Sequence, residues 1–443
     1  MTVESLRATT YHVVTAVWGT EFIDLYLKVC VPNQLTKGNL ESLPPGSRYR
    51  ILTREADVER LQASAGVGQL RRLMPVDVVA VGSDRFETPG KPGQIRNRYG
   101  MMIECHRRAA AQAAVAEAAL IYLAPDVVLG EGTFATLVRL HETGVRAVLV
   151  NALRIKRAEF IAALSARGIE GGLPPRELVR LAMAHLHPAI ESFLVGQPGA
   201  SSVPVMACWP LRSAAGALEA ILVRAFSLHP LLVDPVRRDA LPTTTIDHQY
   251  LMDCCPDRQQ CYVVNDSDEL VIFELTPANQ AIGSRTRGRH LSLRRLAAVA
   301  AGCTPYQRSY WHHAVRLHAG DVDERWLELE AAAAKVTRDL ERYLRFGLTL
   351  RSIYGSLAAW QRAREAHAGA IAKGGRRFAY LRIANMASRS ARRRVERYGD
   401  ALGKVIRPRR VIKRYMRPVR LWWHRTGKAG RMAVKRFRRA RTA

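Results

Sequence analysis

The sequence predicts an α/β fold: a mostly parallel sheet with helices on both faces, followed by a helical and strongly basic C-terminal extension. Along residues 10–170, short apolar segments rich in β-branched side chains alternate with segments whose apolar residues recur every three or four positions. Such alternation with short connections is typical of parallel strand–helix–strand units. Residues 371–443 contain 25 lysines and arginines but two acids, and so carry 23 of the 29 net positive charges of the 443-residue chain.

Strands are expected where short apolar runs end at glycine, proline or a charged residue. These runs are residues 11–18, 49–53, 75–81, 118–124 and 147–150. Helices are expected where the apolar spacing is helical, over residues 21–31, 55–62, 97–118, 134–141, 158–167, 174–186, 214–225 and 325–344. Pro32 is expected to end the first helix because it lacks an N–H. Residues 261–264 and 269–275 are expected to pair as a hairpin around a polar turn.

The predicted sheet is organised around residues 118–126. Residues 118–124 form a continuous apolar run, as expected of a parallel strand that is covered on both faces. Pro125 follows, and the strand pairing should end there. Asp126 then lies at the carboxyl end of the strand, which is the edge where open α/β sheets bind ligands. An aspartate in this place is also a common turn residue or helix cap, and that alternative stays open.

Two common nucleotide-binding motifs are absent from the sequence, and their absence narrows the range of possible functions. No Gly-x-Gly-x-x-Gly follows the first strand and no Gly-Lys-Ser/Thr loop occurs, which argues against a dinucleotide-binding domain and a P-loop nucleotidase. We expect no transmembrane helix, because no apolar run reaches about 18 residues. We expect no secretory signal, because residues 1–10 lack a basic segment followed by an apolar one. The seven cysteines are odd in number and scattered, which favours a reducing compartment over a disulfide framework.

Four segments together resemble a known family. They are Thr15-Ala16-Val17-Trp18-Gly19, the strand that ends before Asp126, His229-Pro230, and Thr245-Ile246-Asp247-His248. Their arrangement over roughly residues 10–280 resembles the GT-A class of nucleotide-sugar glycosyltransferases, as a divergent, family-2-like bacterial member. The resemblance implies a GT-A-like sheet and a domain over residues 1–288 that binds and transfers a sugar from a nucleotide donor.

The resemblance also implies roles for individual residues. The first strand and its loop would hold the donor nucleotide, with Thr15, Trp18 and Glu21 as the contacts. Asp126 would bind the donor diphosphate together with a divalent metal, Mg²⁺ or Mn²⁺. The family's Asp-x-Asp signature is incomplete here, because Asp126 is followed by two valines and the nearest later acid is Glu131.

Further residues would complete the site that the resemblance implies. A later histidine often completes the metal or phosphate site, and His229 is the candidate ligand with His248 as the other choice. Asp247 would deprotonate the acceptor hydroxyl, with Asp253 behind it.

The chemistry of sugar transfer calls for the same groups independently of the resemblance. A diphosphate leaving group develops negative charge, which a metal or cationic side chains must neutralise. The acceptor hydroxyl needs a base within hydrogen-bond reach. Carboxylate oxygens suit Mg²⁺ and Mn²⁺, and Mn²⁺ also accepts histidine.

Simpler structural roles compete with each of these assignments. His229 can be a buried ring with one backbone hydrogen bond, and Asp247 can cap the helix suggested by residues 249–254. Trp18 can belong to the core. Arg154, Lys156 and Arg157 can bind phosphate or form the solvated start of a helix.

The basic tail suggests a partner with negative charge. Aromatic residues are interleaved with its arginines, including Trp422-Trp423 between Arg420 and Arg425. An anionic membrane surface attracts such segments, and tryptophan suits the headgroup layer. Nucleic acid is the less favoured alternative, since phosphates attract the same charges and bases stack on aromatic rings. A disordered solubilising tail is the third possibility.

These features divide the chain into the domain over residues 1–288, a helical extension over 289–345, and a basic tail over 346–443 that is helical or partly disordered. The expected enzyme transfers a sugar from a nucleotide-sugar donor to a cell-envelope or surface-polysaccharide acceptor, such as a lipid-linked glycan. It is expected in the cytoplasm, peripheral to the inner membrane. The alternative is a catalytically degenerate transferase-fold scaffold whose tail binds membrane or nucleic acid.

Overall fold

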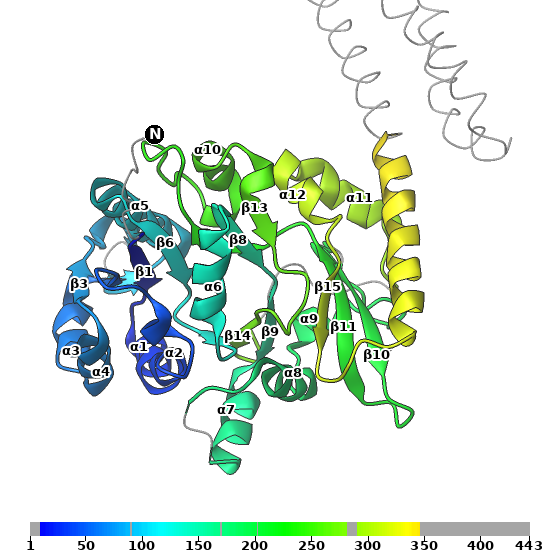
Figure 1. Cartoon of the computed structure of the whole chain (residues 1–443), viewed down its shortest axis with the longest axis horizontal. Helices are drawn as coiled ribbons and strands as arrows, with labels where there is room; N and C mark the ends of the chain where they lie inside the picture. Colours follow the sequence, from blue (N-terminus) through cyan, green and yellow to red (C-terminus); the bar gives the residue numbers. More distant parts are fainter. Residues whose placement is uncertain (1–8, 89–90, 169–170, 202, 281–289, 346–443) are drawn as a thin grey trace, which may run out of the picture. The chain divides into compact units, whose positions relative to one another are not determined.

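The structure is a computed structural model that describes residues 9–345 apart from 89–90, 169–170, 202 and 281–289 (Figure 1). The chain divides into one unit up to Leu344 and a second unit from Arg345 onward. The predicted basic tail over 346–443 lies outside the described residues. The first unit is mixed α/β, as the sequence predicts.

A seven-stranded, mostly parallel sheet forms the centre of the first unit. Its order is β13 (Cys261–Val263), β8 (Ala147–Val150), β12 (His229–Val233), β6 (Ala119–Leu123), β1 (Tyr11–Ala16), β2 (Arg48–Thr53) and β3 (Val76–Ala80). Neighbouring strands are parallel except that β12 runs antiparallel to both β6 and β8. The start of β12 consequently lies at the same edge as the carboxyl ends of its neighbours.

The order of the strands reverses beside β1. The chain steps outward from β1 to β2 and β3 through α1 (Thr20–Leu25), α2 (Val31–Gln34), α3 (Val58–Gln62) and α4 (Ala65–Leu73). It then returns through α5 (Arg98–Ala116) to β6 on the other side of β1. Right-handed crossovers place α5 on the face opposite to the outward connections. The carboxyl ends of β1 and β6 therefore flank a topological switch point, the usual ligand crevice of such sheets.

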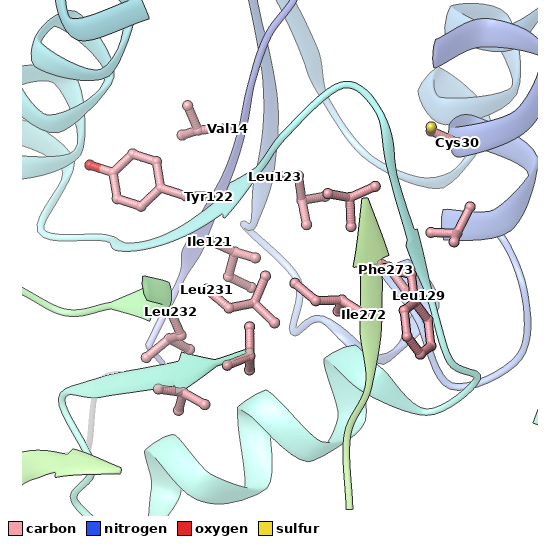
Figure 2. Close-up of a cluster of buried hydrophobic side chains, with 14 of the residues drawn as sticks. Val14, Cys30, Ile121, Tyr122, Leu123, Leu129, Leu231, Leu232, Ile272 and Phe273 are labelled. Carbon is pink, nitrogen blue, oxygen red and sulfur yellow. The ribbon is translucent and has the colours of Figure 1, made fainter. Parts of the chain in front are cut away.

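A second sheet packs against the first. It contains β7 (Val127–Leu129), β14 (Ile272–Thr276) and β9 (Ala152–Lys156), with β14 in the middle. Figure 2 shows side chains of β6 and β12 gathered with Ile272, Phe273 and Leu129 in one buried cluster. Since only three residues separate the end of β6 from the start of β7, the turn between them joins the two sheets.

The remaining elements complete the unit. A three-stranded sheet contains β10 (Met206–Arg212), β11 (Leu218–Ala225) and β15 (Val315–His318), and a two-stranded one contains β4 (Glu87–Thr88) and β5 (Lys91–Ile95). The other helices are α6 (Thr133–Glu142), α7 (Arg157–Ala166), α8 (Pro175–Ala184), α9 (Pro188–Glu191), α10 (Leu251–Cys254), α11 (Leu293–Gly302), α12 (Pro305–Tyr310) and a helix over 325–345. A π-helical turn, η5 (Ile246–Tyr250), precedes α10.

Three predictions of local structure were wrong, two on strands and one on the end of the first helix. Residues 214–225 are not a helix, because most of the segment is β11 and pairs with both β10 and β15. Residues 261–275 are not a hairpin, because β13 joins the edge of the large sheet and β14 the centre of the second sheet. In both cases the pairing partners are remote in the sequence, and a buried apolar run suits a strand as well as a helix.

Pro32 does not end the first helix. The helical path continues from α1 through a π-helical turn, η1 (Tyr26–Cys30), into α2, where Pro32 occupies the first turn. Proline would normally clash with the carbonyl four residues earlier. A π-turn displaces the carbonyls of the preceding turn, and such turns are frequent near functional sites.

Asn33 connects α2 to β7, and we use it to test this packing. Its side-chain amide donates to Leu129 O at 2.9 Å, while Leu129 N donates to Asn33 Oδ1 at 2.7 Å, and Asn33 is buried. Asn33→Ala should lower the free energy of unfolding by about 2–4 kcal/mol, because two buried backbone groups lose their partners. Urea denaturation measures this, with exposed Gln69→Ala on α4 as the control. A loss for Asn33→Ala no larger than that of the control would contradict the packing described.

Candidate functional site at the carboxyl edge of the sheet

The turn Ala124-Pro125-Asp126 lies at the carboxyl end of β6, on one side of the switch point where open α/β sheets usually bind ligands in a crevice. The β6 pairing ends at Leu123, so Pro125 ends the strand as predicted. Leu275 N donates to Asp126 O at 2.7 Å, and Cys30 Sγ donates to Pro125 O at 3.2 Å. The turn is thus held by the second sheet on one side and by the π-helical turn on the other.

Asp126 carries an unusual electrostatic environment. The pKa of its carboxyl is raised to about 7, mainly by burial and also by the negative charge of Glu274, while Arg154 and Arg157 oppose the shift. Burial also raises the pKa of Glu274, again against the charge of Arg154. Two carboxyl groups that share a poorly solvated place resist simultaneous ionisation. This is the environment of a proton carrier or of a group that awaits a cation.

Two arginines complete the Asp126 cluster, which we define as Asp126, Glu274, Arg154, Arg157 and Glu21. Arg154 Nη1 lies 2.9 Å from Glu274 Oε1, across the β9–β14 pair. Arg157, at the start of α7, forms an ion pair with Glu21 in the first turn of α1. Glu21 and Asp126, both predicted to contact the donor, therefore belong to one cluster through Arg157.

The loop after β1 lies on the other side of the switch point. Gly19 has φ of 78°, a left-handed conformation that favours glycine, and its N–H donates to Asp57 Oδ2 at 2.9 Å. Arg54 Nε in turn donates to Asp57 Oδ2 at 2.7 Å. Trp18 is half-buried and packs against the core, so its ring retains some exposed surface.

The predicted donor contact of Thr15 needs correction. Its side chain is fully buried, and its hydroxyl is hydrogen-bonded to the Tyr49 hydroxyl at 2.9 Å. Alternation along β1 directs the Thr15 side chain into the core, and Trp18 follows only after the strand has ended. The Thr15 side chain therefore has no surface for a ligand in this structure.

His229 and Asp247 lie together in a second group, the His229 cluster, with Ser227 and His106. The His229 Nε2–H donates to Tyr122 O at 2.7 Å, and burial lowers the pKa of the ring. The Ser227 hydroxyl donates to Asp247 Oδ2 at 2.8 Å. The pKa of His106 is lowered to about 3, mainly by burial and also by His229, while Asp247 opposes the shift.

The structure does not join the two clusters. Within the described residues no hydrogen bond or ion pair connects Asp126 with His229 or Asp247. The Tyr122 contact leaves Nδ1 as the ring nitrogen of His229 that could ligate a metal. His229 thus shows the backbone-bonded arrangement that competed with its role as a ligand, while a metal at Asp126 stays a prediction.

A different group of side chains could hold a metal ion. Asp266, Asp268 and His318 offer ligand atoms within 4.8 Å of one another. His318 Nδ1 contacts Gly320 O at 2.5 Å and Nε2 contacts Asp266 Oδ1 at 2.8 Å. Both partners accept, so both nitrogens donate, and Asp266 raises the pKa of the ring. The protonated ring and Asp266 form an internal ion pair. A cation that bound to His318 would have to displace the proton on its Nε2.

Sequence reasoning missed several residues of these sites. Asp266 and Asp268 were expected only as a turn, although their Asp-x-Asp spacing was visible. Arg154 and Arg157 were considered for phosphate binding but set behind a solvated helix start. Glu274 and Asp57 gave no local signal, because only the fold brings them to the crevice.

The comparisons with known proteins add no assignment. No family model matches the sequence, and a search of curated proteins finds no match. No helix among the described residues is both long and apolar enough to cross a bilayer.

The raised pKa of Asp126 predicts a pH-dependent cost to folding. Between the ordinary carboxyl pKa near 4 and about 7, the folded state holds a proton that the unfolded state releases, so stability falls as pH rises. Asp126→Asn should therefore be more stable than the wild type at about pH 8.5, by on the order of 1 kcal/mol, and the gap should shrink toward pH 5. Urea denaturation at several pH values measures it.

The matched control is Asp239→Asn, since the Asp239 side chain is 77% exposed. Its gap from the wild type should not change with pH. A pH-independent gap for Asp126→Asn would show that Asp126 is ionised normally in the folded protein.

Proposed function

We propose that this protein is a GT-A-like glycosyltransferase that moves a sugar from a nucleotide-sugar donor to a cell-envelope or surface-polysaccharide acceptor. The observation that carries the proposal is the Asp126 cluster at the switch point of a mostly parallel sheet. A half-buried carboxylate and two arginines at this edge suit a diphosphate and its counter-ion better than a neutral ligand.

The donor would lie between the turn after β6 and the loop after β1. The half-buried ring of Trp18 offers a surface for the base, and Arg154 and Arg157 offer guanidinium groups to the diphosphate. Each arginine is now bonded to a glutamate, so phosphate oxygens would replace Glu274 or Glu21 as partner. Phosphate binding by arginine is charge-assisted and can be bidentate.

The Asp126 cluster fits a divalent cation in its donor chemistry. Asp126 and Glu274 are hard oxygen ligands of the kind that Mg²⁺ and Mn²⁺ prefer, and their mutual repulsion would be relieved by positive charge. Such an ion would supply neutralisation of the diphosphate leaving group. Glu274 thereby offers the second acid that is missing from Asp126-Val127-Val128.

Asp247 is the proposed base for an inverting transfer. The acceptor hydroxyl would attack the anomeric carbon, the bond to the diphosphate would break, and Asp247 would accept the hydroxyl proton. Its contact with Ser227 fixes one carboxylate oxygen and leaves the other for the acceptor. His229 would position this region through the Tyr122 carbonyl rather than contact the donor.

The test combines donor binding and turnover. Thermal-shift measurements with UDP-, GDP- and CMP-sugars, with and without Mn²⁺, should show stabilisation by one nucleotide class. Asp126→Asn should lower donor hydrolysis by about 100-fold or more while the protein stays folded, because the cation that would neutralise the leaving group would lose a ligand. Arg157→Gln should weaken donor binding by about tenfold.

Arg139→Gln is the control, because Arg139 pairs with Glu269 away from the crevice. No stabilisation by any nucleotide would favour the degenerate scaffold instead. Turnover unchanged in Asp126→Asn would remove Asp126 from the mechanism.

The tail would serve the same function if it holds the enzyme at an anionic membrane surface that carries a lipid-linked acceptor. Its composition supports this role, with 23 net positive charges over residues 371–443 and paired tryptophans. Nucleic acid remains the alternative partner.

A further inference from the structure

Two adjoining hollows open beside the outer edge of the large sheet, where Figure 1 shows α12 near β13. The first, which we call the β13 hollow, has a volume of about 240 Å³. Its floor includes Leu149 and Val263, which are paired partners on β8 and β13. The second, the Trp311 hollow, has a volume of about 340 Å³ and shares Arg258 and Ser309 with the first.

Polar groups without protein partners line the β13 hollow. The Tyr310 side chain is 5% exposed, yet its hydroxyl makes no hydrogen bond among the described residues. Arg258 lies 5.9 Å from the centre of the Tyr306 ring and pairs with no carboxylate in the described part of the chain. Buried hydroxyls and surface arginines usually find partners, so these groups retain hydrogen bonds for a ligand.

The walls also define the kind of ligand. Burial lowers the pKa of His313, and His312 and Arg224 lower it further, so its ring is neutral near pH 7 and can both donate and accept. The Tyr306 ring is held by hydrogen bonds from its hydroxyl to Cys255 O at 2.8 Å and Pro256 O at 2.6 Å. A hydroxyl, a neutral imidazole, fixed aromatic rings and one unpaired guanidinium suit a polyhydroxylated ring that bears an anionic group.

A residue that lines the β13 hollow is under the electrostatic influence of the proposed base. Burial raises the pKa of Tyr310, and the negative charges of nearby groups, Asp247 among them, contribute to the rise. Asp247 is therefore near enough to Tyr310, which lines the hollow, to act on it electrostatically. A sugar in this hollow would bring its hydroxyls toward the carboxylate that Ser227 orients.

We infer that the β13 hollow is an acceptor subsite for an anionic saccharide, a sugar ring that carries a phosphate or carboxylate group, and that Arg258 binds the anion. That the bound sugar is an acceptor rests on the proposed function, whereas the existence of the binding site does not depend on it. The volume is below the roughly 300 Å³ at which drug-sized pockets begin, which limits the occupant to about one sugar ring. The Trp311 hollow would hold the next part of a longer acceptor, with Arg258 between the two.

The test uses the full chain and ligand-observed NMR, with glucose 6-phosphate, glucuronate and glucose as probes. Both anionic sugars should bind more tightly than glucose. Arg258→Gln should weaken the two anionic sugars by about tenfold and leave glucose unchanged, because one charge-assisted contact is lost. Tyr310→Phe should weaken all three probes by a similar factor, since the hydroxyl contacts the ring in each.

Arg72→Gln is the matched control, because Arg72 is exposed on α4 and lines neither hollow. The basic tail is common to all variants, so binding of anions by the tail cancels in the comparison. Equal affinities of Arg258→Gln and Arg72→Gln for the anionic sugars would overturn the inference, as would equal binding of glucose. The tighter of the two anionic probes identifies phosphate or carboxylate as the group recognised.

Nucleotide-sugar binding to the same variants separates the two proposals. If nucleotides bind and saccharides do not, the transferase proposal stands and this subsite is wrong. If saccharides bind through Arg258 and nucleotides do not, the saccharide site stands and the transferase proposal fails.

Discussion

The hydrogen bond from Leu275 N to Asp126 O is the constraint on which the candidate site depends. It joins the end of β6 in the large sheet to β14 in the second sheet, within three residues of the switch point. It extends the pairing of β7 with β14 up to the turn, so that the chain after Pro125 is held against the second sheet. The carboxylate of Asp126 is thereby held where burial and the charge of Glu274 act on it together, against the charge of Arg154.

The same hydrogen bond explains why two carboxylates that repel each other lie close together at this site. Asp126 and Glu274 repel each other, and the arginines that oppose this repulsion are themselves shared with Glu21 and Glu274. A structure selected for stability alone would replace such groups by apolar ones of similar size. Retaining them at a crevice is the trade of stability for function that active sites commonly show. A diphosphate with a divalent cation would satisfy both signs of charge at once.

The sequence analysis succeeded where the signal is local. The apolar run before Pro125, the alanine-rich segment that forms α5 and the proline at the start of α8 each predict one structure, because propensity, periodicity and breakers agree. It failed for β11, because an apolar run without alternation fits a helix or a buried strand equally well. It predicted strands where β13 and β14 lie but paired them with each other, because their true partners are remote in the sequence.

The site was predictable to the same extent. Asp126 and Glu21 follow strand ends, so their position at one edge could be expected from the chain order. The burial of the Thr15 side chain was not predicted, because both faces of β1 are buried and the sequence alone does not show this. Glu274 and Asp57 lie far from Asp126 in the sequence, and no short sequence motif identifies them. Chemistry assembled from remote segments becomes visible only when the fold is known.

Hydrogen–deuterium exchange of the full chain, with and without a nucleotide sugar and Mn²⁺, tests the central claim most directly. The account predicts slower exchange in residues 17–25 and 124–131, on the two sides of the switch point, while β10 and β11 exchange as before. Slower exchange confined to other segments, or none with any nucleotide sugar, would contradict the assignment of this edge as the donor site.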